Sequence, residues 1–301
     1  MEEARPVRHP TPAPELSACS WKAGKKRSST PRLPGVLLLG VLSMVGAAQA
    51  QGPADAMARS LSAAFAGCGT TPALDVPLSL AALDLLNGYP LDAALKRQRF
   101  RPHHLSSLSM TYNGDVAWVK AQIRGQCGKV VGFKAFGLAL DGTRLRLILA
   151  TEARVDVSQS QRWMTAFLEA TNRARFQGQK CGGKLMNAVP PLKWDPLLAG
   201  AAARHAGEMV RLNFRGHVNP TDGGKAQQRA AALGFVGVAG ENIAYGPISA
   251  QEAVHQLLTS PVHCENLMYP HWTLFGGSVN NGTPDTIFST YWVQVFGMER
   301  R

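Results

Sequence analysis

The sequence lacks several patterns that mark common enzymes and binding proteins. It has no C-x-x-C pair and no H-E-x-x-H segment, which excludes a zinc ribbon and the commonest zinc-protease signature. It has no G-x-S-x-G segment, so the nucleophile elbow of α/β-hydrolases is missing as well. No nucleic-acid recognition motif is present, and nucleic acid is therefore not expected as a partner.

Long apolar runs are also scarce, and the clearest one lies near the start of the chain. The run GVLLLGVLSMVGAA follows the basic segment KAGKKR and precedes the small-residue pattern Ala48-Gln49-Ala50. A basic region, a short apolar region and an A-x-A site are typical of a secretory signal peptide. We predict a signal peptide over residues 1–50, cleaved after Ala50, and no transmembrane segment in the mature chain. An uncleaved membrane anchor is the alternative.

Acidic residues are fewer than basic ones. The 301 residues include 32 Lys and Arg against 20 Asp and Glu. Removal of residues 1–50 leaves 25 basic and 17 acidic residues, a net charge of +8. Such a charge favours contact with anionic surfaces such as lipid head groups or wall polymers. A solvated basic face with no partner explains the same charge.

Cysteine is rare, and its placement is informative. One of the five cysteines, Cys19, lies in the predicted signal peptide, which leaves an even number in the mature chain. Disulfides form and persist in oxidising compartments outside the cytosol. For an exported chain we therefore expect disulfides rather than a zinc site.

The mature chain contains a weak internal repeat. Helix-like segments at 54–66 and 160–175 each lead into a Cys-Gly pair, and strand-like segments at 143–150 and 286–296 end the two halves. We interpret the chain as two related units, 51–156 and 157–301, with chance similarity of Ala- and Leu-rich sequence as the alternative. Four cysteines allow three pairings. Equivalent positions in the repeat select Cys68–Cys127 and Cys181–Cys264.

The second unit has clear signals for helices and strands. Asp195 followed by Pro196 is a favourable start for a helix. Ser249 and Glu252 have capping-box spacing, with the Glu252 carboxylate expected to reach back to the Ser249 N–H. Pro261 is expected to end that helix. Strands at 271–279 and 286–296 follow, so we predict an α+β fold with helices layered around an antiparallel sheet.

Four ordered segments of the second unit resemble a known family. They are PLKWDPLLAGAAARHAGEMVRLNFRGH, GENIAYG, SPVHCENLM and YWVQVFG. The unit resembles the CAP superfamily, which includes cysteine-rich secretory, antigen 5 and pathogenesis-related proteins (the SCP domain), and is closest to its short bacterial members. The resemblance implies an α-β-α three-layer sandwich with a groove on one face. The unit before it is then a degenerate, smaller α+β copy.

The resemblance also implies which residues line the groove. His217 and His263 match the two histidines of the family, and Glu241 matches its first glutamate. The place of the second family glutamate is taken by Ser260, and Leu257 stands near the place of an expected tryptophan. In the first unit Gln126 stands where His263 stands in the second, so the copy is predicted to be structural.

These residue types suit a cation, although no cofactor is required. Two neutral imidazoles and one carboxylate are ligands that suit Zn²⁺, with a position left open for water or ligand. We therefore consider His217 and His263 as metal ligands. Because imidazole must lose its proton to bind metal, binding is expected to weaken in acid.

The same residues also allow two arrangements for nucleophilic catalysis. Ser260 could act as a nucleophile with His263 and Glu241, and Cys264 could form a dyad with His263. Adjacent residues in an extended segment point in opposite directions, which favours a disulfide for Cys264. We interpret the histidines of the two flanking helices and the acid next to Cys264 as packing, surface or structural residues: His205, His255 and Glu265.

Three functions from different classes remain. The first is a secreted, non-enzymatic protein that binds a small apolar ligand such as a sterol or lipid, a cation or an envelope partner in the groove. The second is a metal-dependent, peptidase-like hydrolase that uses His217 and His263 with Glu241 as base. The third is a cell-envelope interaction protein without a small ligand. We expect the protein to be secreted, either periplasmic or extracellular.

Overall fold

The computed structural model describes residues 51–299. The predicted signal peptide and its cleavage site lie outside these residues. Within them, no helix combines the length and the apolar character needed to cross a membrane.

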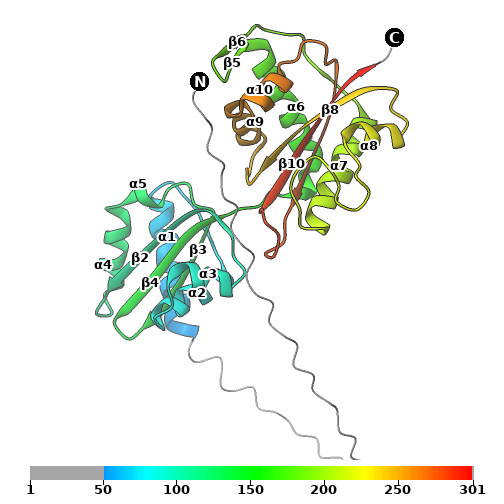
Figure 1. Cartoon of the computed structure of the whole chain (residues 1–301). Helices are drawn as coiled ribbons and strands as arrows, with labels where there is room; N and C mark the ends of the chain where they lie inside the picture. Colours follow the sequence, from blue (N-terminus) through cyan, green and yellow to red (C-terminus); the bar gives the residue numbers. More distant parts are fainter. Residues whose placement is uncertain (1–50, 300–301) are drawn as a thin grey trace, which may run out of the picture. The chain divides into compact units, whose positions relative to one another are not determined.

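Residues 51–152 form a first α+β unit, drawn in blue to green in Figure 1. Its sheet has the order β1-β3-β4-β2, with β1 parallel to β3 and the other neighbours antiparallel. Apolar side chains of α1 and α4 pack on one face of this sheet, and those of α2 and α3 pack on the other. The elements in chain order are α1 (Gln51–Gly67), β1 (Ala73–Leu74), α2 (Val76–Leu86), α3 (Leu91–Arg97), β2 (Pro102–Thr111), α4 (Val116–Arg124), α5 (Cys127–Val130), β3 (Ala135–Asp141) and β4 (Arg144–Glu152).

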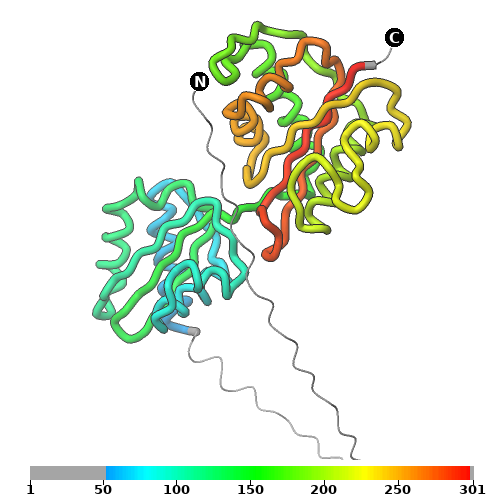
Figure 2. Tube along the Cα trace, in the orientation of Figure 1, coloured from blue at the N-terminus to red at the C-terminus, as the bar shows by residue number. Residues whose placement is uncertain are grey.

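Residues 157–299 form a second unit with the same kind of layering (Figure 2). Its main sheet has the order β7-β9-β10-β8, which leaves β8 at an edge. The elements are the 3₁₀ turn η1 (Val157–Gln159), α6 (Ser160–Gln177), β5 (Gln179–Cys181), β6 (Lys184–Met186), β7 (Lys193–Trp194), α7 (Pro196–Arg211), α8 (Ala226–Ala232), β8 (Gly237–Tyr245), α9 (Ala250–Thr259), α10 (Pro261–Leu267), β9 (Leu274–Asn281) and β10 (Thr290–Glu299).

Two apolar cores lie on opposite faces of this second sheet. On one face α6, α9 and α10 bury Phe167 and Leu257 against Phe275 and Trp292 of the strands. On the other face α7 and α8 bury a second cluster that includes Met209. A sheet with an apolar core on each face is a three-layer α-β-α sandwich. The predicted α+β layered fold is confirmed.

Local chemistry explains how α7 approaches the sheet. The Asp195 side chain accepts a hydrogen bond from the Leu198 N–H at 2.8 Å, and Pro196 occupies the first turn of the helix. A Cβ atom at Gly276 of β9 would overlap the backbone at Leu198 and Ala199. The absence of a side chain at Gly276 therefore lets α7 lie directly against the sheet.

Each unit contains one disulfide, between the cysteines that the internal repeat predicted to pair. Cys68 is bonded to Cys127 with a Cα–Cα distance of 5.2 Å, and Cys181 to Cys264 with a distance of 5.4 Å. Both predicted pairings are confirmed. The second bridge ties α10 to the β5–β6 hairpin.

Pro261 ends α9 as predicted: that helix stops at Thr259, and Pro261 occupies the first turn of the separate helix α10, where its missing N–H costs nothing. One local prediction was wrong. The Glu252 carboxylate accepts from the Ile248 N–H at 3.0 Å instead of the Ser249 N–H. The other half of the cap forms as expected, since the Glu252 N–H donates to the Ser249 hydroxyl.

A buried arginine fixes the segment that follows α10. Arg175 of α6 is fully buried, and its guanidinium donates to the carbonyls of Pro190, Leu267, Tyr269 and Trp272 at 2.7–3.1 Å. Burial without an acidic partner lowers the pKa of Arg175 to about 10. One side chain thus binds three carbonyls of residues 267–272 and also the carbonyl of Pro190.

We predict that Arg175→Met lowers the free energy of unfolding by about 3 kcal/mol, because it leaves several buried carbonyls without a donor. Denaturant unfolding of purified protein measures the change. Arg173→Met, at an exposed position on the same helix, is the matched control and should change stability little. Equal effects of the two substitutions would contradict the role given to the Arg175 network.

Candidate groove site at the edge of the second sheet

The site is organised around Glu241 on the edge strand β8. Glu241 pairs with Val295 of β10, and its side chain is only 3% exposed. A carboxylate this deeply buried requires a charged or hydrogen-bonded partner. The structure supplies such a partner to each of its two oxygens.

Arg229 of α8 is the first partner. Its Nη2 lies 2.6 Å from Glu241 Oε2, and its own side chain is also 3% exposed. The same guanidinium donates to the carbonyl of Gly224 at 2.8 Å and to that of His217 at 3.3 Å. Arg229 therefore neutralises Glu241 and also holds the loop over residues 212–225 that joins α7 to α8.

His217 of that loop is the second partner. Its Nδ1 lies 2.9 Å from Glu241 Oε1, and because a carboxylate oxygen accepts, this ring nitrogen donates. The neutral ring then has its lone pair on Nε2. The His217 side chain is 49% exposed, so the carboxylate orients an imidazole that remains open to solvent.

His205 of α7 forms a hydrogen bond with the same loop. Its Nε2 donates to the Gly216 carbonyl at 2.9 Å and lies 3.7 Å from Glu241 Oε1. Within the described residues its Nδ1 has no hydrogen-bond partner, and it lies 3.9 Å from Glu208 Oε2. Burial lowers the pKa of His205. Because its side chain is fully buried, His205 is a packing residue and not a surface residue.

His263 of α10 lies across the edge strand from the loop. The ring centroids of His217 and His263 are 6.4 Å apart, with the ring planes tilted by 57°. Burial, and then the nearby His217, lower the pKa of His263 and favour its neutral form. The structure places His263 in a helix held by the Cys181–Cys264 bridge.

Two asparagines connect α10 to the strand that carries Glu241. Asn242 Nδ2 donates to the His263 carbonyl at 3.0 Å. Asn266 Nδ2 donates to the Glu241 carbonyl at 3.2 Å and to Asn242 Oδ1 at 2.9 Å. The asparagine after Glu241 and the one in CENLM thus set the distance between the histidines.

Among residues 51–299, the side chains of the remaining candidates make no hydrogen bond or ion pair with Glu241, Arg229, His217 or His263. Ser260 stands between α9 and α10, and its hydroxyl makes no hydrogen bond within residues 51–299. Glu265 forms an exposed ion pair with Lys184 at 3.6 Å. His255 is exposed on α9, and Glu252 caps the start of that helix.

Sequence reasoning missed Arg229, Asn242 and Asn266. Arg229 lies in the Ala-rich segment AQQRAAALGF, where a lone arginine among small residues was the available signal. The two asparagines lie inside motifs that were quoted only for their glutamate and histidine. Their role depends on the distance between β8 and α10, which no local pattern contains.

The donor set fits a loosely held cation better than a closed metal centre. Both Glu241 oxygens are occupied by Arg229 and His217, so two imidazoles remain as ligands. Across the described residues, no group of three or more His, Cys, Asp or Glu side chains is placed to hold a metal. A carboxylate behind a ligating histidine is nevertheless the usual way to orient such a ligand.

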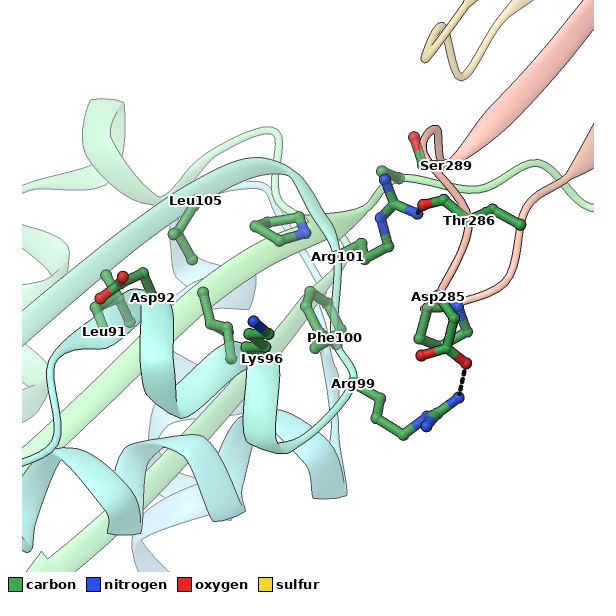
Figure 3. A pocket seen from close by; sticks show the side chains of 14 residues that line it. Leu91, Asp92, Lys96, Arg99, Phe100, Arg101, Leu105, Asp285, Thr286 and Ser289 are labelled. Atoms are coloured by element: carbon green, nitrogen blue, oxygen red, sulfur yellow. Dashed lines mark hydrogen bonds and ion pairs between the residues drawn. The ribbon is translucent and has the colours of Figure 1, made fainter. Parts of the chain in front are cut away.

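An open pocket of about 890 Å³ is lined by other residues (Figure 3). Its lining includes Leu91, Phe100 and Leu105, and Arg99 forms an ion pair with Asp285 at 2.9 Å beside it. It does not include the two groove histidines or Glu241.

Fold and site together define a class: a disulfide-linked α-β-α sandwich with a pair of histidines beside a buried glutamate at the edge of its sheet. The model of the cysteine-rich secretory protein family, CAP, matches residues 168–296. This part of the chain is a CAP domain, and the resemblance inferred from the four segments is confirmed. No curated protein matches the chain.

Solved structures similar to the chain include an extracellular protein containing an SCP domain from Bacillus anthracis, with 21% identity and a TM-score of 0.37. That match covers 55% of this chain and 56% of that chain. An outer surface protein from Borrelia burgdorferi has 20% identity and a TM-score of 0.37, over 48% of this chain and 96% of that one. A cysteine-rich secretory protein from Staphylococcus aureus has 16% identity and a TM-score of 0.33, over 55% and 56% of the two chains.

We predict that Arg229→Met lowers the free energy of unfolding by about 3–5 kcal/mol, because it leaves the buried Glu241 carboxylate uncompensated. Combining it with Glu241→Gln removes that charge and should restore part of the loss. Chemical denaturation of the parent, of Arg229→Met and of the double variant measures the loss of stability and its recovery. Arg204→Met, at an exposed arginine of α7, serves as the control, and a double variant less stable than Arg229→Met would contradict the pairing.

A second prediction concerns pH. Because the pKa of His205 is lowered in the folded state, the unfolded chain binds a proton that the folded chain does not as pH falls below about 6.5. Stability should therefore fall between pH 7 and pH 5, and less steeply in His205→Gln, whose amide can still donate to Gly216. Unfolding free energies measured across this range test the slope. The exposed His255→Gln should keep the parent slope, and an unchanged slope in His205→Gln would refute the assignment.

Proposed function

We propose that the protein is a secreted, non-enzymatic binding protein whose CAP groove holds a cation between His217 and His263, beside a small apolar ligand or an envelope partner. One observation carries this proposal: the hydrogen bond from His217 Nδ1 to the buried Glu241. It selects the tautomer whose Nε2 lone pair is available outside the protein core.

The second histidine supports the same interpretation. His263 has a lowered pKa, and a neutral imidazole is the form that binds metal. With ring centroids 6.4 Å apart, the two imidazoles are near enough to share one ion. Zn²⁺ suits two such nitrogens, with water or ligand atoms completing the coordination.

Apolar side chains lie next to both histidines in the chain. Val218 follows His217 and is 46% exposed, and Val262 precedes His263 and is 76% exposed. Exposed valines beside a polar pair favour a ligand with an apolar body and a polar head, such as a fatty acid or sterol. The predicted mature charge of +8 is compatible with an anionic lipid surface.

The alternative, a metal-dependent hydrolase, has weaker support. A general base needs a free lone pair directed at the attacking water. Glu241 instead has one oxygen bonded to Arg229 and the other to His217. Ser260, which was considered as a nucleophile, has no hydrogen-bonded base in the described part of the chain.

We also propose that residues 51–156 are a degenerate copy of the CAP domain. The sheet orders β1-β3-β4-β2 and β7-β9-β10-β8 correspond strand for strand. Gly137 of β3 lies against α2 as Gly276 of β9 lies against α7, since a Cβ at either would overlap the helix. Asp75 caps α2 as Asp195 caps α7.

The copy would have lost its groove. Two steps across the sheet from Gly276 lies Glu241, and two steps from Gly137 lies Ser107. Gln126 precedes the disulfide cysteine of the first unit, where the second has His263. The connection from α2 to α3 spans only residues 87–90, so it has no counterpart of the loop that carries His217.

We predict that the purified protein binds Zn²⁺ and that His217→Ala and His263→Ala each weaken binding at least about tenfold, because each removes one of two protein ligands. Isothermal titration measures the affinity. His255→Ala, at an exposed histidine of α9, is the matched control and should bind like the parent.

The same variants separate the competing functions. Binding of a fluorescent fatty acid or sterol that falls in the double variant His217→Ala/His263→Ala, while circular dichroism shows an intact fold, supports the groove as a binding site. Chelator-sensitive cleavage of casein or peptidoglycan fragments would favour the hydrolase. Zinc affinity unchanged in the double variant would place the cation elsewhere and refute the proposal.

A further inference from the structure

The edge strand β2 of the first unit exposes backbone groups that nothing in the described chain occupies. The Tyr112 N–H donates to the Thr143 carbonyl, so even-numbered residues of β2 face β4 in this antiparallel pair. The Ala150 carbonyl, opposite Leu105, accepts from Lys134 on the β3 side. Odd-numbered residues of β2 therefore direct N–H and C=O groups away from the sheet: Leu105, Ser107, Ser109 and Thr111.

The corresponding edge of the CAP domain is closed by side-chain amides. Gln227 donates to the Gly237 carbonyl and accepts from the Ala239 N–H. Gln256 bonds both backbone groups of Tyr245, and Asn266 bonds the Glu241 carbonyl. Natural proteins commonly block sheet edges in such ways, because an open edge pairs with other strands. For the outward groups of β2, no hydrogen bond occurs within residues 51–299.

Other devices that protect an edge are confined to one end of β2. Pro102 and an irregularity in register lie at its start. From Leu105 to Thr111 the sequence LSSLSMT contains neither charge nor proline, and Leu105 is 38% exposed. Lysine, proline and bulges are the usual protection, and this seven-residue stretch has none of them.

The geometry points to β2 as a pairing surface for a second copy of this chain, with the two β2 strands antiparallel about a two-fold axis. An uncharged strand is self-complementary, because no like charges meet when it pairs with itself. A charged peptide partner would find no opposite charge on this stretch.

One register satisfies the outward groups together. With the axis at Leu108, Leu105 faces Thr111 of the second copy and Ser107 faces Ser109. Each of these pairs would exchange two hydrogen bonds, as opposed residues of an antiparallel ladder do. The two four-stranded sheets would then join into one continuous sheet through β2.

Sedimentation velocity and light scattering across a wide concentration range test this inference on the purified protein. We expect a reversible dimer. Ser107→Pro removes an N–H that faces away from β4, so the unit's own sheet keeps its hydrogen bonds while the dimer dissociation constant rises about tenfold or more. Ser107→Val keeps the N–H and is the matched control, which should dimerise like the parent.

Charge placed on the strand gives a second test that a folding defect cannot imitate. Chains with Ser107→Lys and Ser109→Lys, or with Ser107→Glu and Ser109→Glu, should each be monomeric, because like charges meet across the axis. Mixing the two should restore a dimer. A parent that stays monomeric at all concentrations, or a dimer that persists in the lysine variant, would overturn the inference.

Discussion

The buried ion pair between Glu241 and Arg229 is the interaction on which the arrangement around His217 depends. Each charge is almost fully removed from water, so each needs the other. Arg229 also holds the loop through the carbonyls of Gly224 and His217, and Glu241 sets the ring of His217. The buried ion pair thus determines which ring nitrogen of His217 donates to Glu241 and which one keeps its lone pair.

The other side of the groove is positioned by different means. His263 lies on α10, which is held by the bridge from Cys181 to Cys264, by the two asparagines and by the carbonyls that Arg175 collects at its end. One histidine therefore depends on buried charge and the other on a covalent link and amide hydrogen bonds. Their separation of 6.4 Å results from both.

The first unit has a sheet of the corresponding strand order, β1-β3-β4-β2, and is the proposed copy of the CAP domain. It keeps the disulfide, the capped helix and the glycine at the close approach between helix and sheet. It has Ser107 and Gln126 in place of the acid and the histidine, and a short connection between α2 and α3.

The sequence by itself determined the layered α+β fold and both disulfides, because hydrophobic period, cap residues and paired cysteines are local or repeated signals. The family followed from the resemblance of four ordered segments, and the family model matches residues 168–296. It also named His217, Glu241 and His263 through a resemblance. Only the tertiary structure decided that Glu241 is enclosed by Arg229 and His217, and that a second helix, α10, begins at Pro261 and carries His263. These features depend on which side chains meet across separate elements, and a buried charge selects its partner by distance in space, which spacing along the chain does not encode.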